Sequence, residues 1–221
     1  ATGLLVVFVG RATRAVEFAE ADSKEYIAGL RLGVSTDTQD ITGNTLKSSN
    51  SLPSRAELEQ ALDAFKGEIS QIPPMYSAIK VGGKKLYELA REGKTIEREA
   101  RSVKILNLTI EEMDLPRVTM TVTCSKGTYI RVLGEDLATA LGTCGTMSFL
   151  LRTQVGAYTI DKACTLQEIA ENPEACAAEP LTAVAELPKL KVNARQAARI
   201  TNGVRTTVAQ TADGRYVLLE P

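Results

Sequence analysis

The sequence of 221 residues contains no histidine and no tryptophan, and only 5% of its residues are aromatic. Without histidine there is no Ser-His-Asp or Cys-His catalytic group, no histidine general base and no zinc site with imidazole ligands. Any acid–base chemistry of these residues must therefore use Asp, Glu, Lys, Tyr or Cys.

The chain also lacks a Cys-x-x-Cys pair and a long hydrophobic run. Its four cysteines are Cys124, Cys144, Cys164 and Cys176. Their spacing supports neither a metal knuckle nor a redox motif, and it is typical of a reduced, cytoplasmic protein. The longest apolar run near the start, Leu4 to Val9, is too short to span a membrane and has no basic leader. We therefore expect a cytoplasmic protein without a membrane segment.

Charge is nearly balanced overall, with 26 basic and 27 acidic side chains, but it is unevenly distributed. Residues 76–104 contain eight Lys or Arg against four Glu, and residues 189–215 contain six against one Asp. Residues 161–188, between them, contain six acids against one Lys. Two basic blocks around an acidic one fit a local polyanion-binding surface. Solvated surface charge is the commoner explanation of such runs.

The apolar pattern predicts strands and helices in an irregular order, which indicates an α+β fold. Three segments are predicted as strands: residues 3–9 (buried), 25–32 and 154–160. Two are predicted as helices: residues 54–66, with a Ser54–Glu57 capping box, and 129–141. Residues 34–53 are polar and predict a long loop, which is typical of function or disorder. Residues 212–215 predict a hairpin turn between short strands.

The segment Cys124-Ser-Lys-Gly-Thr-Tyr-Ile-Arg131 joins the end of a predicted strand to the start of a helix. Gly127 permits a tight turn, and the free N–H groups of a helix start favour an anion. Lys126 and Arg131 add positive charge, and Tyr129 supplies an aromatic face. The segment therefore predicts a site for a carboxylate or phosphate beside a flat ring. A capped helix with surface charges is the alternative.

Five further segments precede this one: Gly10-Arg-Ala-Thr-Arg14, Asp22-Ser-Lys-Glu-Tyr26, Arg31-Leu-Gly-Val-Ser-Thr-Asp-Thr-Gln-Asp40, Gln71-Ile-Pro-Pro-Met-Tyr-Ser-Ala-Ile-Lys80 and Gly83-Lys-Lys-Leu-Tyr-Glu-Leu-Ala-Arg91. In this order the six segments resemble the TruB family, the bacterial tRNA pseudouridine-55 synthases. The resemblance runs to about Leu166 and continues loosely into the C-terminal basic block. It implies a mixed, mainly antiparallel sheet flanked by helices. We expect a catalytic domain over residues 1–178 and part of a PUA-like RNA-binding β domain over 179–221.

The resemblance implies an isomerase that detaches a uridine base in the T-arm of tRNA and rejoins it through carbon. Such enzymes flip the target nucleotide out of the stack, which requires an aromatic platform. The expected partner is tRNA. The resemblance implies no metal or organic cofactor, and no obligate protein partner is evident.

The resemblance also assigns three catalytic residues. Tyr26 would stack on the base and is a candidate for the final proton abstraction; the alternative is a core aromatic on a strand. Arg131 would pair with the nucleophilic aspartate and keep it ionised. Asp40 would tether Arg131, although an aspartate in a loop is more often a turn former.

Further residues would bind substrate. Tyr129 and Leu150 match positions that line the uracil pocket, although ordinary helix packing also explains Leu150. Side chains expected to contact phosphates are Lys80, Lys84, Lys85 and Arg91, and Arg195, Arg199 and Arg205 would extend this track. Solvated charge remains an alternative for each.

This sequence departs from the family pattern at the nucleophile. In the family it is an aspartate in a Gly-x-Leu-Asp-Pro segment, followed directly by an Ala-Thr-Gly type of run. This sequence begins with Ala1-Thr2-Gly3, so we expect the nucleophile a few residues upstream and these 221 residues alone to be inactive. Two other hypotheses stay open: a non-catalytic tRNA-binding or RNA-chaperone module, and an α+β domain with an unrelated small-molecule site.

Overall fold

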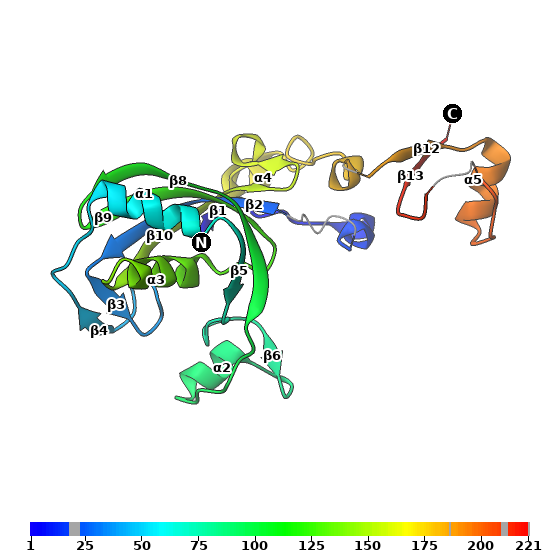
Figure 1. The fold of residues 1–221 in the computed structure, drawn as a ribbon. Coiled ribbons are helices and arrows are strands. Elements are labelled where there is room, and N and C mark those ends of the chain that lie inside the picture. Colours follow the sequence, from blue (N-terminus) through cyan, green and yellow to red (C-terminus); the bar gives the residue numbers. More distant parts are fainter. Residues whose placement is uncertain (18–22, 186, 209–211, 221) are drawn as a thin grey trace. The chain divides into compact units, whose positions relative to one another are not determined.

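The computed structural model describes residues 1–17, 23–185, 187–208 and 212–220 (Figure 1). The chain forms two compact units. The first contains residues 1–6 and 21–163, and the second contains residues 7–20 and 164–221.

A seven-stranded sheet forms the centre of the first unit. Its strands lie in the order β1-β10-β2-β9-β8-β5, and β11 pairs with β10. Their bounds are Thr2–Gly3 (β1), Ser23–Leu32 (β2), Gly67–Gln71 (β5), Arg101–Asp114 (β8), Arg117–Ser125 (β9), Gly145–Val155 (β10) and Tyr158–Thr159 (β11). β1 runs parallel to β10, whereas the other neighbouring pairs are antiparallel. The expected α+β fold with a mixed, mainly antiparallel sheet is confirmed.

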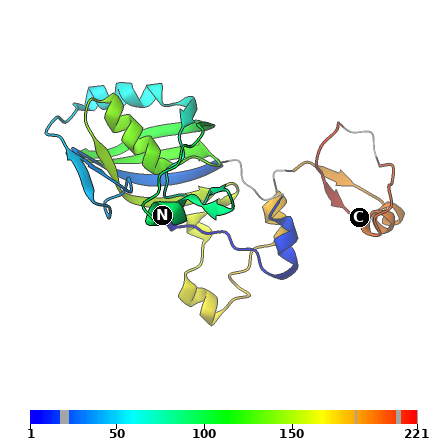
Figure 2. The same cartoon turned by 90° about the horizontal axis from the view of Figure 1, so that it is seen from below.

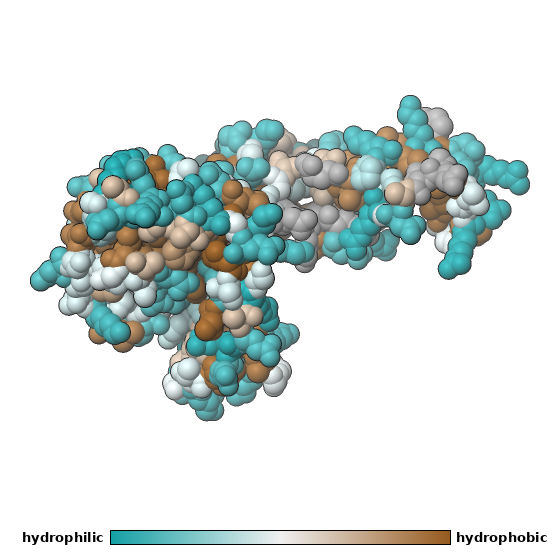
Figure 3. All heavy atoms as spheres, viewed as in Figure 1, coloured by the Kyte–Doolittle hydropathy of each residue, from teal (hydrophilic) through white to brown (hydrophobic). Residues whose placement is uncertain are grey.

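Two helices, α1 (Arg55–Ala64) and α3 (Ile130–Ala140), cover the same face of this sheet (Figure 2). Leu58 and Leu62 of α1 and Leu133 and Leu137 of α3 are buried in one hydrophobic core with the strands between them. Hydrophilic side chains cover the outer face of α1 (Figure 3). The helices therefore fix one face of the sheet as the core side.

The alternation predicted for residues 25–32 is confirmed in β2. Tyr26, Ala28 and Leu30 all point into the core and are at most 8% exposed. β2 lies between β9 and β10, so each of its residues faces a partner on both sides. Tyr26 is thereby placed opposite Arg152 of β10.

The helix signals in the sequence are also confirmed. The Ser54 side chain accepts a hydrogen bond from the Glu57 N–H, and the Glu57 carboxylate accepts one from the Ser54 N–H. α3 begins directly after Tyr129 and ends before Gly142, whose φ of 70° lies in the left-handed region. Both ends follow the expected chemistry of helix starts and stops.

A small hairpin and a helix project from the sheet in the first unit (Figure 1). The hairpin strands are β6 (Lys80–Val81) and β7 (Lys84–Lys85), and the helix is α2 (Leu86–Arg91). Gly82 and Gly83 form the turn with φ of 58° and 86°, angles that other residues rarely adopt.

Three strand and loop predictions are wrong. The strand expected over residues 3–9 pairs only through Thr2–Gly3, and Leu5, Val7 and Val9 are 69–78% exposed. Hydrophobic composition favours a strand, but β11 occupies the edge of β10 beyond Arg152, so the ladder with β1 cannot continue. The loop expected over 34–53 contains an antiparallel pair, β3 (Val34–Thr36) and β4 (Thr45–Ser48). The single strand expected over 154–160 is two strands, because it contains the end of β10 and, after a turn, β11.

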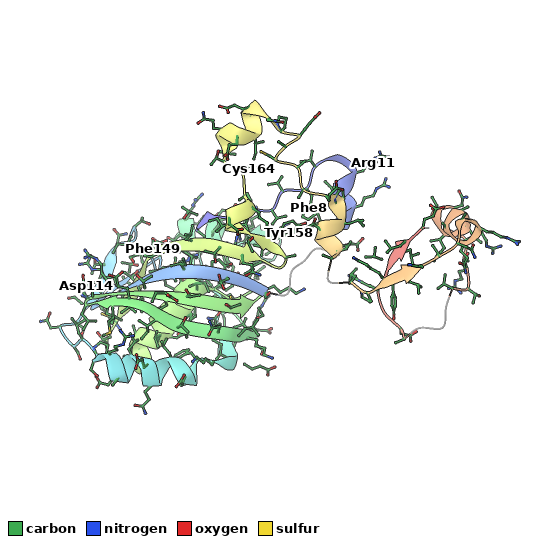
Figure 4. The ribbon with its side chains drawn as sticks, turned by 90° about the horizontal axis from the view of Figure 1, so that it is seen from above. Phe8, Arg11, Asp114, Phe149, Tyr158 and Cys164 are labelled. Atoms are coloured by element: carbon green, nitrogen blue, oxygen red, sulfur yellow. The ribbon has the colours of Figure 1, made fainter. Side chains whose placement is uncertain are left out.

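Phe149 of β10 shows how the two faces of the sheet differ. It is 46% exposed and lies on the side of the sheet away from α1 (Figure 4). Its ring covers Gly29 of β2, where an added Cβ would lie 2.3 Å from the ring carbons. Leu150, next along the strand, packs against the core instead.

The second unit contains short elements. Their bounds are Gly10–Ala15 (η1), Leu166–Glu171 (α4), Pro180–Val184 (η3), Lys189–Lys191 (β12), Ala194–Thr201 (α5) and Val217–Leu219 (β13), and η1 lies beside η3 (Figure 4). The described strand after residues 212–215, β13, pairs with β12 in parallel, and the first strand of the hairpin expected there falls partly on residues 209–211, outside the described residues. A domain boundary at 178/179 and a PUA-like identity stay predictions. None of the described helices has the length and hydropathy to cross a membrane.

Candidate active site

A cavity of about 370 Å³ opens in the first unit, at the end of the sheet where α3 begins. Its volume lies at the small end of the range for ligand pockets, about 300–1,000 Å³. Its lining residues are Ala1, Tyr26, Asp40, Thr128, Tyr129, Ile130, Arg131, Met147, Leu150 and Arg152. Five residues selected from the sequence are among them, namely Tyr26, Asp40, Tyr129, Arg131 and Leu150. They come from β2, the 37–44 loop, the start of α3 and β10.

Arg131, in the first turn of α3, is held by backbone carbonyls. Its Nη1 donates to the Thr38 carbonyl at 3.1 Å and its Nη2 to the Tyr76 carbonyl at 2.7 Å. The side chain is 22% exposed and lines the cavity. Two anchors from different loops leave the planar guanidinium little freedom, which suits it to hold an anion in one orientation.

Asp40 lies near Arg131, but its closer partners are elsewhere. Its Oδ2 is 3.8 Å from Arg131 Nη1, within ion-pair distance and beyond a hydrogen bond. Its Oδ1 accepts from the Thr42 hydroxyl at 2.6 Å and the Thr42 N–H at 3.0 Å. Partial burial opposes ionisation, but the hydrogen bonds from Thr42 and Thr38 and the charge of Arg131 together lower the pKa of Asp40.

The loop that carries Asp40 is attached to β10. The Ile41 N–H donates to the Met147 carbonyl at 2.8 Å, and the Met147 N–H donates to the Gln39 carbonyl at 3.1 Å. The buried hydroxyls of Thr36 and Thr146 lie 3.0 Å apart beneath these contacts. The loop is therefore a structured wall of the cavity.

Tyr26 lies on the core side of β2, with Arg152 beside it. Burial raises the pKa of the Tyr26 hydroxyl, and the neighbouring Cys124 adds to this rise, whereas a hydrogen bond from Arg152 and its charge lower it. Arg152 is itself fixed, because its Nε donates to the Leu4 carbonyl at 2.7 Å. Burial also raises the pKa of the Cys124 thiol to about 11, so this thiol stays protonated.

Tyr129 forms the N-terminal boundary of α3, and no side chain of its own caps the helix. The side chain of Gln71, the last residue of β5, instead holds both backbone groups of Tyr129. Its Oε1 accepts from the Tyr129 N–H at 3.0 Å, and its Nε2 donates to the Tyr129 carbonyl at 3.3 Å. Gln71 is 2% exposed, so this pair of bonds is formed in the interior.

Leu150 lines the cavity from a strand. It lies in β10, and it also packs against the hydrophobic core that α3 helps to form. With Met147 it supplies an apolar wall opposite the charged groups. The cavity thus combines aromatic, apolar and charged surfaces, as a planar polar ligand requires.

The expected phosphate-binding residues lie outside the cavity. Lys126 is exposed in the turn after β9, where Gly127 has a φ of 83°. Lys80, Lys84, Lys85 and Arg91 lie together on the projecting hairpin and α2. Lys84 forms an ion pair with Glu92 at 3.2 Å, and Lys85 and Arg91 lie within 5.4 Å of the Tyr87 ring centre. Arg195, Arg199 and Arg205 belong to the second unit.

Sequence reasoning missed two residues at the site, Arg152 and Gln71. Arg152 follows Leu150 by two positions, so a strand assigned to residues 145–155 would have placed both on one face. Gln71 stands in a segment that the resemblance had selected, but no pattern in the sequence announces its contact with Tyr129. Among the described residues, no cluster of three or more Cys, Asp or Glu side chains could hold a metal ion.

Solved structures share this fold. The chain matches one titled "Crystal Structure of a Cbf5-Nop10-Gar1 Complex" with a TM-score of 0.66 and 25% identity, covering 89% of this chain and 53% of that one. It also matches "Structure of H/ACA RNP bound to a substrate RNA containing 2'-deoxyuridine" with a TM-score of 0.68 and 21% identity, covering 96% of this chain and 60% of that one. The fold class is that of the Cbf5/TruB-type pseudouridine synthases.

Sequence comparison identifies the family. The model of the TruB family pseudouridylate synthase N-terminal domain matches residues 1–130, and that of the tRNA pseudouridylate synthase B C-terminal domain matches residues 131–185. The chain belongs to the TruB family of pseudouridylate synthases. The expected family and the expected class of enzyme, an isomerase, are confirmed.

Curated relatives carry the same family name. A tRNA pseudouridine synthase B of Hydrogenovibrio crunogenus is 43% identical over 95% of this chain and 70% of its own length. Those of Alkaliphilus oremlandii and Symbiobacterium thermophilum are 47% and 42% identical, over 76% and 93% of this chain. The chain spans 56% and 70% of the length of these two relatives.

Proposed function

We propose that this chain carries the uridine-binding site of an enzyme that converts a uridine in the T-arm of tRNA to pseudouridine. The convergence of Tyr26, Asp40, Tyr129, Arg131 and Leu150 on one cavity carries this proposal. The relatives named tRNA pseudouridine synthase B support tRNA as the substrate. They do not favour a non-catalytic RNA-binding module.

The reaction is an isomerisation, so atoms and electrons balance within the substrate. The bond between C1′ of the ribose and N1 of uracil breaks, and a bond forms between C1′ and C5. C5 then loses its proton, and N1 gains one. No oxidant or reductant is consumed.

The cavity suits a base that has left the helical stack. Flipping a nucleotide costs a few kcal/mol of stacking and pairing, which contacts to the extruded base must offset. Tyr26 and Tyr129 offer aromatic rings, and Leu150 offers an apolar wall. These groups would hold the uracil ring while it is detached and turned.

Tyr26 and Arg152 would form the proton-accepting pair. Tyr26 is buried in the cavity wall, and a phenol in such a position is a weak base at neutral pH. Burial raises the pKa of Tyr26 overall, and the hydrogen bond and charge of Arg152 offset part of this rise. Tyr26 would then take the proton from C5 with the assistance of Arg152.

Arg131 would orient the nucleophilic carboxylate, which we expect on residues upstream of Ala1. Ala1 itself lines the cavity, so a residue joined closely before it would act at this site. The two carbonyl anchors of Arg131 would hold the guanidinium for that carboxylate, with Asp40 as a secondary partner. Lys80, Lys84, Lys85 and Arg91 would contact the RNA backbone.

The experiment compares three proteins: the 221-residue chain, the same chain extended upstream through a Gly-x-Leu-Asp-Pro segment, and the extended chain with Asn in place of that Asp. Each is incubated with a T-arm stem-loop RNA, and pseudouridine is mapped chemically. We expect pseudouridine only with the extended Asp protein. All three should bind the RNA, and salt should weaken binding because phosphate contacts release counterions.

Two outcomes would contradict parts of this proposal. Pseudouridine made by the 221-residue chain, or by the Asn protein, would show that the nucleophile is assigned wrongly. RNA binding without pseudouridine from the extended Asp protein would favour the non-catalytic module.

A further inference from the structure

We propose that Gln71 is a positioning residue, which fixes Tyr129 and the first turn of α3 so that the cavity is ready for the base. This inference rests on the proposed function for its catalytic consequence. Its structural basis, the contact between a buried side-chain amide and the backbone N–H and carbonyl of Tyr129, stands by itself.

The contact is complete in both directions. The amide of Gln71 donates to the Tyr129 carbonyl and accepts from the Tyr129 N–H, as a neighbouring strand would. Tyr129 has an extended backbone, with φ −102° and ψ 105°, so its N–H and its carbonyl can both reach the amide of Gln71. Its carbonyl also accepts the first helical bond, from the Leu133 N–H at 3.0 Å. Gln71 therefore fixes the residue at the N-terminal boundary of α3 through both of its backbone groups.

The position of Gln71 in the chain connects this contact to Arg131. Gln71 ends β5, and five residues later the Tyr76 carbonyl accepts from Arg131 Nη2. One segment, residues 71–76, thus holds Tyr129 through a side chain and Arg131 through a carbonyl. Only Ile130 separates Tyr129 from Arg131 at the start of α3. A shift of either the Gln71 side chain or the Tyr76 carbonyl would therefore move both residues.

The environment makes the contact hard to replace. Gln71 is 2% exposed, so water cannot readily take over the hydrogen bonds that a substitution removes. An apolar residue of similar size would leave the Tyr129 N–H without its partner. The Tyr129 ring would then sample several positions, whereas contacts between the protein and the RNA outside the cavity would persist.

The test uses the extended chain described above and two variants. Gln71→Met keeps the side-chain volume and removes both hydrogen bonds. We expect the rate of pseudouridine formation to fall by roughly 10- to 100-fold, because a misplacement of about 1 Å costs about that much. The Kd for the stem-loop RNA should stay within about threefold, because the RNA-backbone contacts are intact.

Gln71→Glu supplies a pH-dependent rescue. A protonated carboxyl group can donate to the Tyr129 carbonyl and accept from the N–H, whereas a carboxylate repels the carbonyl. Burial raises the pKa of a carboxyl group, so the protonated form should persist toward neutral pH. At pH 5.5 this variant should be nearly as active as the unsubstituted chain at the same pH. At pH 8.5 its activity, again relative to the unsubstituted chain, should fall to the level of Gln71→Met. Gln60→Glu, on the exposed surface of α1, is the matched control and should show no such pH dependence.

Fluorine NMR gives a readout that does not need activity. With 3-fluorotyrosine, the line that disappears in Tyr129→Phe belongs to Tyr129. In Gln71→Glu this line should match the unsubstituted chain at pH 5.5 and shift or broaden at pH 8.5, while the Tyr26 line stays in place. The same comparison decides the matter if Gln71→Met does not fold.

Two results would overturn the proposal: an unsubstituted rate for Gln71→Met, or a Tyr129 line in Gln71→Glu that matches that of the unsubstituted chain at both pH values. If the extended chain itself makes no pseudouridine, the proposed function fails, and the NMR spectra still decide whether Gln71 holds Tyr129.

Discussion

The anchoring of Arg131 leads to a quantitative prediction. Arg131→Met removes two hydrogen bonds from a charged donor, to the Thr38 carbonyl at 3.1 Å and the Tyr76 carbonyl at 2.7 Å. Each such bond contributes about 1.5–3 kcal/mol to stability. Because Arg131 is 22% exposed and water can reach part of the site, we take the lower end, about 3 kcal/mol in total.

This loss translates into a shift in thermal unfolding. For a unit of about 150 residues, 1 kcal/mol corresponds to roughly 2–4 °C, so the Tm of the first unit should fall by about 6–12 °C. Arg131→Lys keeps one charged donor and should lose about half as much. Asp40→Ala should cost less than about 1 kcal/mol through the ion pair, since the pair is partly exposed and 3.8 Å long.

Differential scanning calorimetry measures these shifts, because it separates the transitions of two units. Arg117→Met, at an exposed position of β9, is the matched control and should change the Tm by less than 2 °C, corresponding to about 0.5 kcal/mol. The reasoning is refuted if Arg131→Met shifts the Tm no more than this control. Because Asp40→Ala also removes the hydrogen bonds from Thr42, the ion pair is isolated by the double variant: a loss well below the sum of the two single losses would show that the ion pair holds the arginine.

Three further predictions concern other groups. In the extended chain, Arg152→Met should move the rising limb of the pH–rate profile to higher pH, because the hydrogen bond and charge that lower the pKa of Tyr26 are lost. An unchanged limb would exclude Tyr26 as the base. Thr146→Val should lower the free energy of unfolding in urea by about 1 kcal/mol, because its buried hydroxyl bond to Thr36 is lost, and Thr146→Ser should retain that stability. Lys80→Ala should reduce the slope of log K against log salt for RNA binding by about 0.7–0.9, as measured by fluorescence anisotropy; an unchanged slope would place Lys80 away from phosphate.

Local signals in the sequence predicted the elements whose residues interact with near neighbours. The Ser54–Glu57 capping box and the stop at Gly142 depend on contacts within a few residues, and the alternating face of Tyr26, Ala28 and Leu30 follows from the two-residue period of any strand. The strand predicted over residues 3–9 failed for the opposite reason. A strand needs a partner, and the hydrophobic composition of a segment says nothing about where its partner ends.

The sequence by itself determined the kinds of chemistry available: no imidazole, and a set of ordered segments with Tyr26, Asp40, Tyr129 and Arg131 at matching places. It could not determine which of these side chains meet, because they lie up to 105 residues apart. The tertiary structure decided that Arg131 is held mainly by the Thr38 and Tyr76 carbonyls, that Arg152 faces Tyr26, and that Gln71 holds Tyr129. Each of these contacts joins a side chain to a distant strand or loop, and only the assembled sheet with α3 against it brings such groups together.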